Sequence, residues 1–128
     1  MKNKVVLHFI GGEIKKGTTE DFFPNKDIFH FTNSDGGEQS KISLQNLKAI
    51  FFVKSFDGNR NYQERDDVER TGFGKKIEVI FKDGELQRGY TQGYAPNRPG
   101  FFIFPSDPDS NNERVFVVNA ATSDVRFL

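Results

Sequence analysis

Apolar and polar residues alternate in short runs along this chain, and the spacing of an amphipathic helix is nowhere sustained. In KVVLHF (4–9) and KIEVIF (76–81), apolar residues recur at alternate positions, which is typical of a strand with one buried face. Further strands are expected around Ile14, Phe29, Ile42 and 48–53, and again around Leu86, Phe101, 113–118 and 124–128. The pattern predicts an all-β protein with one helical turn at 45–47 and a short break at 119–123.

The second half of the chain repeats the first at a constant offset of 72 residues. Placing Lys4 on Lys76 aligns the two halves without a gap as far as Phe29 on Phe101, and the identical pairs include Phe9 with Phe81, Gly12 with Gly84, Gly17 with Gly89 and Pro24 with Pro96. Self-similarity at a fixed offset is the sequence signature of a duplicated structural unit. The two copies are therefore expected to fold alike.

The glycines of each copy suggest how its strands turn and bend. Gly12 and Gly84 suit tight hairpin turns, whereas Gly17 and Gly89 lie within the expected second strands, where a glycine usually marks a bulge or a sharp bend. Because small barrels close through strongly bent strands, we expect two tandem SH3-like or Sm-like small barrels that pack together. Their expected bounds are 1–54 and 76–128, with a charged linker at 55–75.

The hairpin resembles the first Sm motif. The resemblance is carried by Gly84, Gly89 and Gly93, and it implies a bent five-stranded barrel. Ala95 and Phe23 stand where that family has its base-reading aspartate. The resemblance therefore favours the small-barrel fold, and binding of RNA is an alternative function.

A second resemblance covers most of the chain and is clearest at GYTQGYAPNRPGFFIFPSDPDSNNERVFV (89–117). This run resembles an uncharacterised bacterial all-β domain that accompanies signalling modules such as receiver and PilZ domains. The likeness implies a regulatory or adaptor role, and it brings no activity with it. It is carried by Gly89, Pro96, Arg98, Gly100, Phe101, Asp107, Ser110, Asn111, Asn112 and Arg114.

Composition narrows the function classes. The 128 residues carry 18 basic and 18 acidic side chains, so there is no broad positive field of the kind that sequence-independent binding to nucleic acid or anionic membranes needs. Cysteine is absent, which removes disulfides, thiolate nucleophiles and cysteine zinc sites. No apolar run is long enough for a signal peptide or a membrane span. A soluble, cytoplasmic protein is expected, and its core depends on 15 phenylalanines.

Two charged stretches invite a ligand, and each also has a plainer interpretation. In the linker, Arg60, Arg65 and Arg70 suggest phosphate binding, but the arginine spacing of PilZ domains is missing and mixed-sign runs usually face solvent. In SDPDSNNER (106–114), alternating oxygen side chains resemble the start of a calcium loop, yet Asn112 and Val118 replace its glycine and bidentate glutamate. A loop whose side chains fold back on their own backbone amides is expected there instead. No metal or other cofactor is therefore predicted.

The chain shows no catalytic motif. Its two histidines, His8 and His30, fall within expected strands, and no nucleophile elbow, Walker loop or HExxH sequence is present. We therefore expect a protein that is not an enzyme. The leading hypothesis is a binding or adaptor module whose partner is another protein.

The candidate binding residues lie in the second copy. Aromatic and arginine side chains suit recognition surfaces, and Tyr90, Tyr94, Arg98 and Arg114 are candidates on this ground, with the alternative that they pack between the copies or form ordinary surface pairs. Asn111 and Asn112 join them through the resemblance. An RNA- or nucleotide-binding regulator of Sm-like or PilZ-like type is the alternative function, and it predicts that Lys15, Lys16, Arg88 and Arg98 cluster on one face. The sequence does not decide whether the copies pack within one chain or swap between chains.

Overall fold

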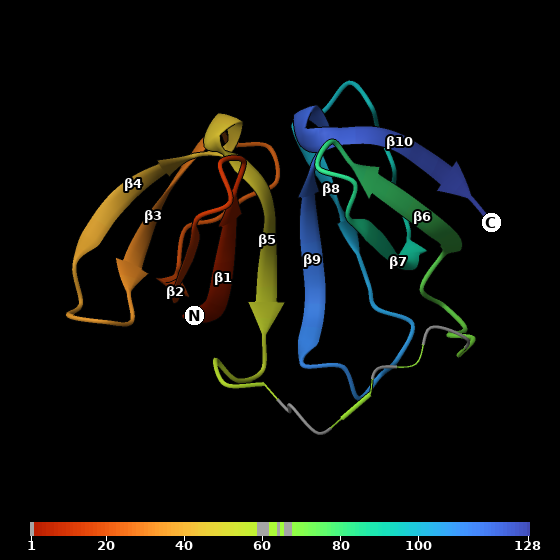
Figure 1. Cartoon of the computed structure of the whole chain (residues 1–128), viewed down its shortest axis with the longest axis horizontal. Helices are drawn as coiled ribbons and strands as arrows, with labels where there is room; N and C mark the ends of the chain where they lie inside the picture. The colour runs from red at the N-terminus through yellow and green to blue at the C-terminus, as the bar shows by residue number, and fades with distance from the viewer. Residues whose placement is uncertain (1, 59–61, 64, 66–67) are drawn as a thin grey trace.

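The protein is described by a computed structural model that covers residues 2–58, 62, 63, 65 and 68–128. This part of the chain contains ten strands, two single-turn 3-10 helices and no α-helix (Figure 1). The first half contains β1 (Asn3–Phe9), β2 (Ile14–Thr19), β3 (Ile28–Asn33), β4 (Gln39–Ser43), η1 (Leu44–Asn46) and β5 (Leu47–Val53). The second half contains β6 (Lys75–Phe81), β7 (Leu86–Thr91), β8 (Gly100–Ile103), β9 (Asn112–Val118), η2 (Asn119–Ala121) and β10 (Thr122–Phe127). The predicted all-β class is confirmed.

The strands form two sheets. The larger has seven strands in the order β4-β3-β2-β1-β5-β9-β8, and the smaller has three in the order β10-β6-β7. All named pairs are antiparallel. A single bridge between Tyr90 and Phe104 follows the end of β8 and links β7 to this part of the chain.

The seven-stranded sheet crosses from one half of the chain to the other. In Figure 1, β5 and β9 lie side by side at the centre, and they pair antiparallel from Ala49 opposite Val117 to Val53 opposite Asn112. The expectation of two closed barrels is thus wrong for the described strands, which form two open sheets. Main-chain pairing between the halves adds to the side-chain packing that was expected.

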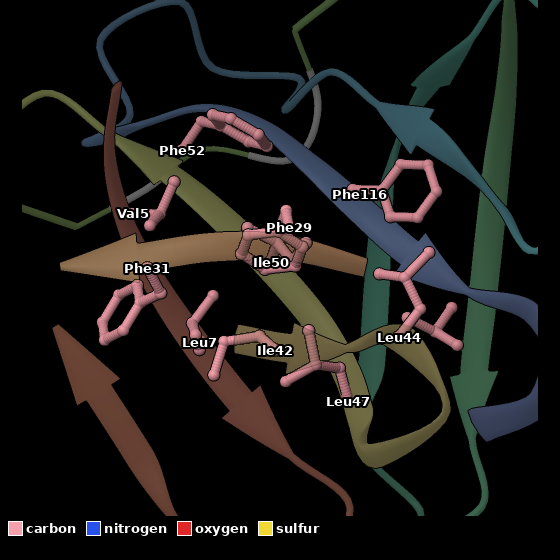
Figure 2. Close-up of a cluster of buried hydrophobic side chains, with 11 residues drawn as sticks. Val5, Leu7, Phe29, Phe31, Ile42, Leu44, Leu47, Ile50, Phe52 and Phe116 are labelled. Atoms are coloured by element: carbon pink, nitrogen blue, oxygen red, sulfur yellow. The ribbon is translucent and has the colours of Figure 1, made fainter. Parts of the chain in front are cut away.

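Two hydrophobic clusters lie on opposite faces of β5 and β9. Val5, Leu7, Ile50, Phe52 and Phe116 belong to the first cluster, which the strands of the first half enclose (Figure 2). The second cluster lies under the three-stranded sheet and includes Ala49, Phe51, Val53, Val115, Val117, Ile77 and Val79. Every residue of β5 is buried, because the strand supplies side chains to both clusters.

The first hairpin of each half has the same strand register. All six pairs of β1 with β2, from Asn3 opposite Thr19 to His8 opposite Ile14, recur in β6 and β7 with both members 72 residues later. The turn glycines Gly12 and Gly84 have φ values of 95° and 91°, so both turns use the left-handed backbone region that glycine favours. The expected hairpins are present in both halves.

The halves also share a bulge. One residue, Lys48, is skipped where β1 pairs with β5, and one residue, Ser123, is skipped where β6 pairs with β10. In both places, the skipped residue directly follows the first residue of the last strand in its half. A bulge of this kind bends the strand and redirects its side chain.

Gly17 and Gly89 lie where another strand approaches closely. A Cβ atom at Gly17 would overlap the carbonyl oxygen of Thr32, and one at Gly89 would overlap the carbonyl oxygen of Phe104. Both glycines therefore allow the second strand of their half to approach the third.

Among the described residues, no helix is long and apolar enough to span a bilayer.

Candidate functional site

The two candidate tyrosines make contacts within the protein. Tyr90 is buried, and its hydroxyl donates a hydrogen bond to the carbonyl of Val68 at 3.2 Å. Tyr94 is half-buried and makes edge contacts with Phe101 and Phe127 at centroid distances of 4.9 and 6.0 Å. Both residues therefore pack within the protein, but these contacts are with the linker and with the second half itself, not between the copies as the alternative expected.

Asn111 joins two distant segments. Its side chain donates to the carbonyl of Ser55 at 2.8 Å and accepts from the amide of Ser55 at 3.1 Å. Its carbonyl accepts from the amide of Lys54 at 2.8 Å. Asn112 begins β9, and its amide donates to the Ser110 hydroxyl at 3.1 Å. Asn111 thus ties the end of β5 to the loop before β9, which is a structural role.

Arg98 and Arg114 are the two candidates whose guanidinium groups have no hydrogen-bond acceptor among the described residues. Arg98 is exposed and lines a groove of ≈ 410 Å³ together with Pro24, Asn25 and Asn97. Arg114 is half-buried on β9, and its guanidinium carbon lies 4.4 Å from the ring centroid of Phe52 and 4.7 Å from that of Phe102. The N–H donors of both guanidinium groups are therefore available to bind a ligand.

A groove of ≈ 380 Å³ lies between the two halves. Apolar residues of both halves line it: Val6, Phe51, Val53 and Phe56 from the first and Leu86 from the second. Leu86 at the start of β7 is 46% exposed, so this side chain is presented to solvent. The groove exists only where the two halves meet, and the sequence alone did not predict it.

Polar side chains surround this apolar lining. His8 extends from β1 and its ring lies 4.3 Å from the ring of Phe51, and burial lowers the pKa of His8 below its ordinary value. Glu85, Gln87 and Asn112 also line the groove. Apolar lining with a few placed polar groups is typical of binding sites.

Next to the groove, Lys48 holds the β6–β7 turn against β5. Its ammonium lies 2.8 Å from the carboxylate of Asp83, forms a second ion pair with Glu85, and lies 4.6 Å from the centroid of the Phe81 ring. Burial opposes the charge, but the two carboxylates outweigh burial and raise the pKa of Lys48. The bulge directs this lysine toward the other half, and the ion pairs fix one wall of the groove.

The loop before β9 contains a buried carboxylate. The side chain of Asp107 is fully buried and accepts hydrogen bonds from the Tyr62 hydroxyl, from the Arg65 amide at 3.0 Å and from the Asp109 amide at 2.9 Å. The hydrogen bond from Tyr62, followed by those from the two amides, holds the pKa of Asp107 far below its usual value. The bond to Asp109 confirms the loop interpretation for 106–111, whereas 112–114 belong to β9.

The contacts of Asp107 also involve the predicted linker. Part of this linker lies outside the described residues, namely 59–61, 64, 66 and 67, and Arg60 is among them. Arg65 lies 3.4 Å from Asp107, and Arg70 donates to the carbonyl of Pro105 at 3.0 Å. Both arginines suggested a phosphate site. Their partners are instead groups of this chain, and the linker is anchored to the 105–107 segment.

A second polar hollow, of ≈ 250 Å³, contains a histidine and an aspartate. The Nδ1 atom of His30 lies 2.6 Å from Asp21, whose other oxygen accepts the His30 amide at 2.8 Å. The hydrogen bond from the His30 ring lowers the pKa of Asp21. Among the described residues, no group of three histidine, aspartate or glutamate side chains is placed to hold a metal ion, and no nucleophile contacts the ring of His30.

Two of the four basic residues proposed to cluster are paired with carboxylates. Lys15 lies 3.5 Å from Glu13, and Arg88 lies 2.7 Å from Glu78. Lys16 donates to the carbonyl of Phe56 at 3.1 Å, while Arg98 lines the separate groove beside Pro24. Pairing with carboxylates weakens the argument for a continuous basic surface.

Comparison with known proteins adds a family and no activity. No match was found among curated proteins or among solved structures. A family model does match the chain, over residues 1–128, and its description states that the function of the family is unknown. A link to receiver or PilZ modules stays a prediction. By this match over its whole length, the chain belongs to the family of unknown function DUF6982.

Proposed function

We propose that this protein is a non-catalytic binding module that recognises another protein through the groove between its halves. The observation that carries the proposal is the composition of this groove, in which apolar side chains from both halves are surrounded by His8, Glu85, Gln87 and Asn112. Protein interfaces commonly combine an apolar centre with a polar rim. An adaptor role in bacterial regulation, in the cytoplasm, is the form of this function that the resemblance favours.

The scaffold in this proposal is a duplicated small β-unit of SH3-like or Sm-like type. Matching hairpin registers, matching bulges and the paired glycines Gly17 and Gly89 support a common origin of the halves. Neither half has this groove by itself, because its lining combines residues of β1 and β5 with residues of β7. Duplication would thus have created a surface that a single unit lacks.

Site-specific photocrosslinking in cells tests the proposal. A photoreactive phenylalanine analogue replaces Leu86 in the groove, and the same analogue replaces Ile28 as the matched control. Both are strand residues with comparable exposure, 46% and 52%, but Ile28 does not line the groove. The proposal predicts a discrete protein adduct at position 86 and none at position 28. Equal labelling at both positions, or no adduct at position 86, would contradict it.

A nucleotide-binding regulator is the second candidate. The groove of ≈ 410 Å³ beside Arg98, Pro24, Asn25 and Asn97 favours it, since this volume is in the range of small-molecule sites. Thermal-shift measurements with mononucleotides, cyclic dinucleotides and short RNAs test this function, because a ligand that binds only the folded state raises Tm. A saturable shift that Arg98→Gln removes would favour this function over the adaptor.

A further inference from the structure

Beyond the groove, we propose a second binding surface at Arg114 that takes an acidic segment of a partner protein, with a carboxylate on the guanidinium and an apolar side chain on the neighbouring rings. This surface is independent of the groove between the halves. It is defined by Arg114, Phe52, Phe102 and Phe22. Below it is called the Arg114 seat.

The Arg114 guanidinium is held against two rings but has no acceptor among the described residues. Its carbon lies 4.4 Å and 4.7 Å from the ring centroids of Phe52 and Phe102. Contact with ring faces leaves the N–H groups at the edge of the guanidinium plane available, and a planar guanidinium binds a carboxylate through two such groups. Fixing the side chain in advance lowers the entropy lost on binding.

Most of the other described arginines differ from Arg114 because they have an acceptor within the protein. Among the six described arginines, four have an acceptor within the protein: Arg65 with Asp107, Arg70 with the Pro105 carbonyl, Arg88 with Glu78 and Arg126 with Asp124. Arg114 has none in the described part of the chain, although it is half-buried. An internal ion pair therefore does not explain why arginine stands at this position.

Carboxylates close to the seat in sequence do not pair with Arg114. Glu113 directly precedes Arg114, but it is exposed and accepts no hydrogen bond from it. Phe22 contacts Phe52 and Phe102 at 5.7 and 6.2 Å, and Asp21 directly precedes it. Both oxygens of Asp21 accept hydrogen bonds from His30, so this carboxylate is committed elsewhere. Glu20 and Asp27 on the same loop are exposed and accept no hydrogen bond from Arg114.

The aromatic rings around Arg114 indicate the second feature of the partner, an apolar side chain beside its carboxylate. Phe22 and Phe102 are half-buried, so each ring has surface left for an apolar side chain. Arginine combined with aromatic rings is typical of energetic hot spots in protein interfaces. A carboxylate beside a large apolar residue would fit both features of the seat.

A nucleic acid fits the surface less well. Stacked bases also bind to aromatic and arginine side chains, but affinity for a phosphate backbone depends on several unpaired cations along one track. Lys15, Arg88 and Arg126 are held in ion pairs with carboxylates, and the chain has no net charge. Charge complementarity therefore favours a single carboxylate site.

Selection of random 12-residue peptides displayed on phage, against the intact protein, tests the proposal. We expect the selected peptides to share an aspartate or glutamate next to a large apolar residue. In fluorescence polarisation, Arg114→Gln should weaken their binding about tenfold or more, and the amide version of the peptide should lose affinity to a similar extent. Arg114→Lys, which keeps the charge but loses bidentate geometry, should give an intermediate loss.

Two control variants distinguish the Arg114 seat from the groove and from a general effect of charge. Arg126→Gln removes an exposed arginine of β10 that is paired with Asp124 and should leave peptide binding unchanged. Leu86→Lys alters the groove and should also leave it unchanged, so failure of the groove proposal and failure of this one are distinguishable. The proposal would be overturned by a selection without carboxylate peptides, by one that yields no binder, by binding unaffected in folded Arg114→Gln, or by displacement of the peptide by a uridine decanucleotide.

Discussion

At the scale of single residues, the matched glycines permit close approach of neighbouring strands. Gly89→Ala would place a methyl group against the carbonyl oxygen of Phe104 and the side chain of Ile103, whereas Gly93→Ala finds open space. We expect Gly89→Ala to lower the free energy of unfolding by about 1–3 kcal/mol, as overpacking does, and Gly93→Ala to change it little. Urea denaturation of the two variants measures both values, and equal stability of the variants would refute the close approach.

Lys48 gives a second prediction at this scale. Its side chain is 11% exposed, but those of Asp83 and Glu85 are 55% and 51% exposed, so its ion pairs are intermediate between surface and buried ones. We expect Lys48→Met to destabilise the protein by about 1–2 kcal/mol. In a double-mutant cycle, Glu85→Gln should cost less in Lys48→Met than in the wild type. Additive effects would show that the pair does not hold the turn.

Sequence reasoning worked best where a residue acts through its neighbours in the chain. Alternation located Val5, Leu7 and Phe9 on their strand, and Gly12 marked the turn, because period and turn chemistry are local properties. It did not find the role of Asp107. This aspartate lies among proline, serine and asparagine residues that suggest an exposed loop, and its partner Arg65 is 42 residues away in the chain.

At the scale of elements, the 105–110 loop and the linker are held together by that carboxylate. Because its pKa is lowered in the folded state, Asp107 contributes stability that is present above about pH 4, the ordinary carboxyl pKa. This contribution is lost as the pH falls further. The anchoring of the linker is therefore expected to weaken in acid and to be complete at neutral pH.

Asp107→Asn tests this anchoring at neutral pH. The amide keeps the size of the side chain but removes the charge, so hydrogen exchange at the amides of Arg65 and Asp109 should become faster. Asp109→Asn is the matched control. Its carboxylate lies 4.0 Å from Arg65, but this side chain is 73% exposed, so the ion pair should contribute little, and it is the backbone amide of Asp109 that binds Asp107. Unchanged exchange in Asp107→Asn would show that the linker is held by other contacts.

The strand order shows where element-level prediction stops. The helical turn expected at 45–47 is present one residue earlier, as the 3-10 helix η1 at Leu44–Asn46, and the strands on either side of it are present, with β5 at Leu47–Val53. The partner of β5 was missed, because alternation shows which face of a strand is buried and not which strand lies beside it. The run LKAIFFV is apolar on both faces, which is the local signal of a strand covered on two sides.

At the scale of the whole molecule, the two halves are joined by main-chain pairing as well as by packing. β5 and β9 pair with each other and carry side chains into both hydrophobic clusters. Separate barrels would have been two nearly independent units, whereas strands shared between two cores couple the stability of one half to that of the other. The groove proposed for partner binding depends on this junction.

We expect the two halves to form one cooperative unit, and native-state hydrogen exchange along a urea series tests this most directly. The amides of Leu7 in the first half and Val79 in the second are suitable reporters, since both side chains are fully buried and each strand is paired on both sides. Both amides are expected to exchange only through global unfolding, with the same free energy and the same urea dependence. Two different free energies, with one half opening while the other stays folded, would contradict it.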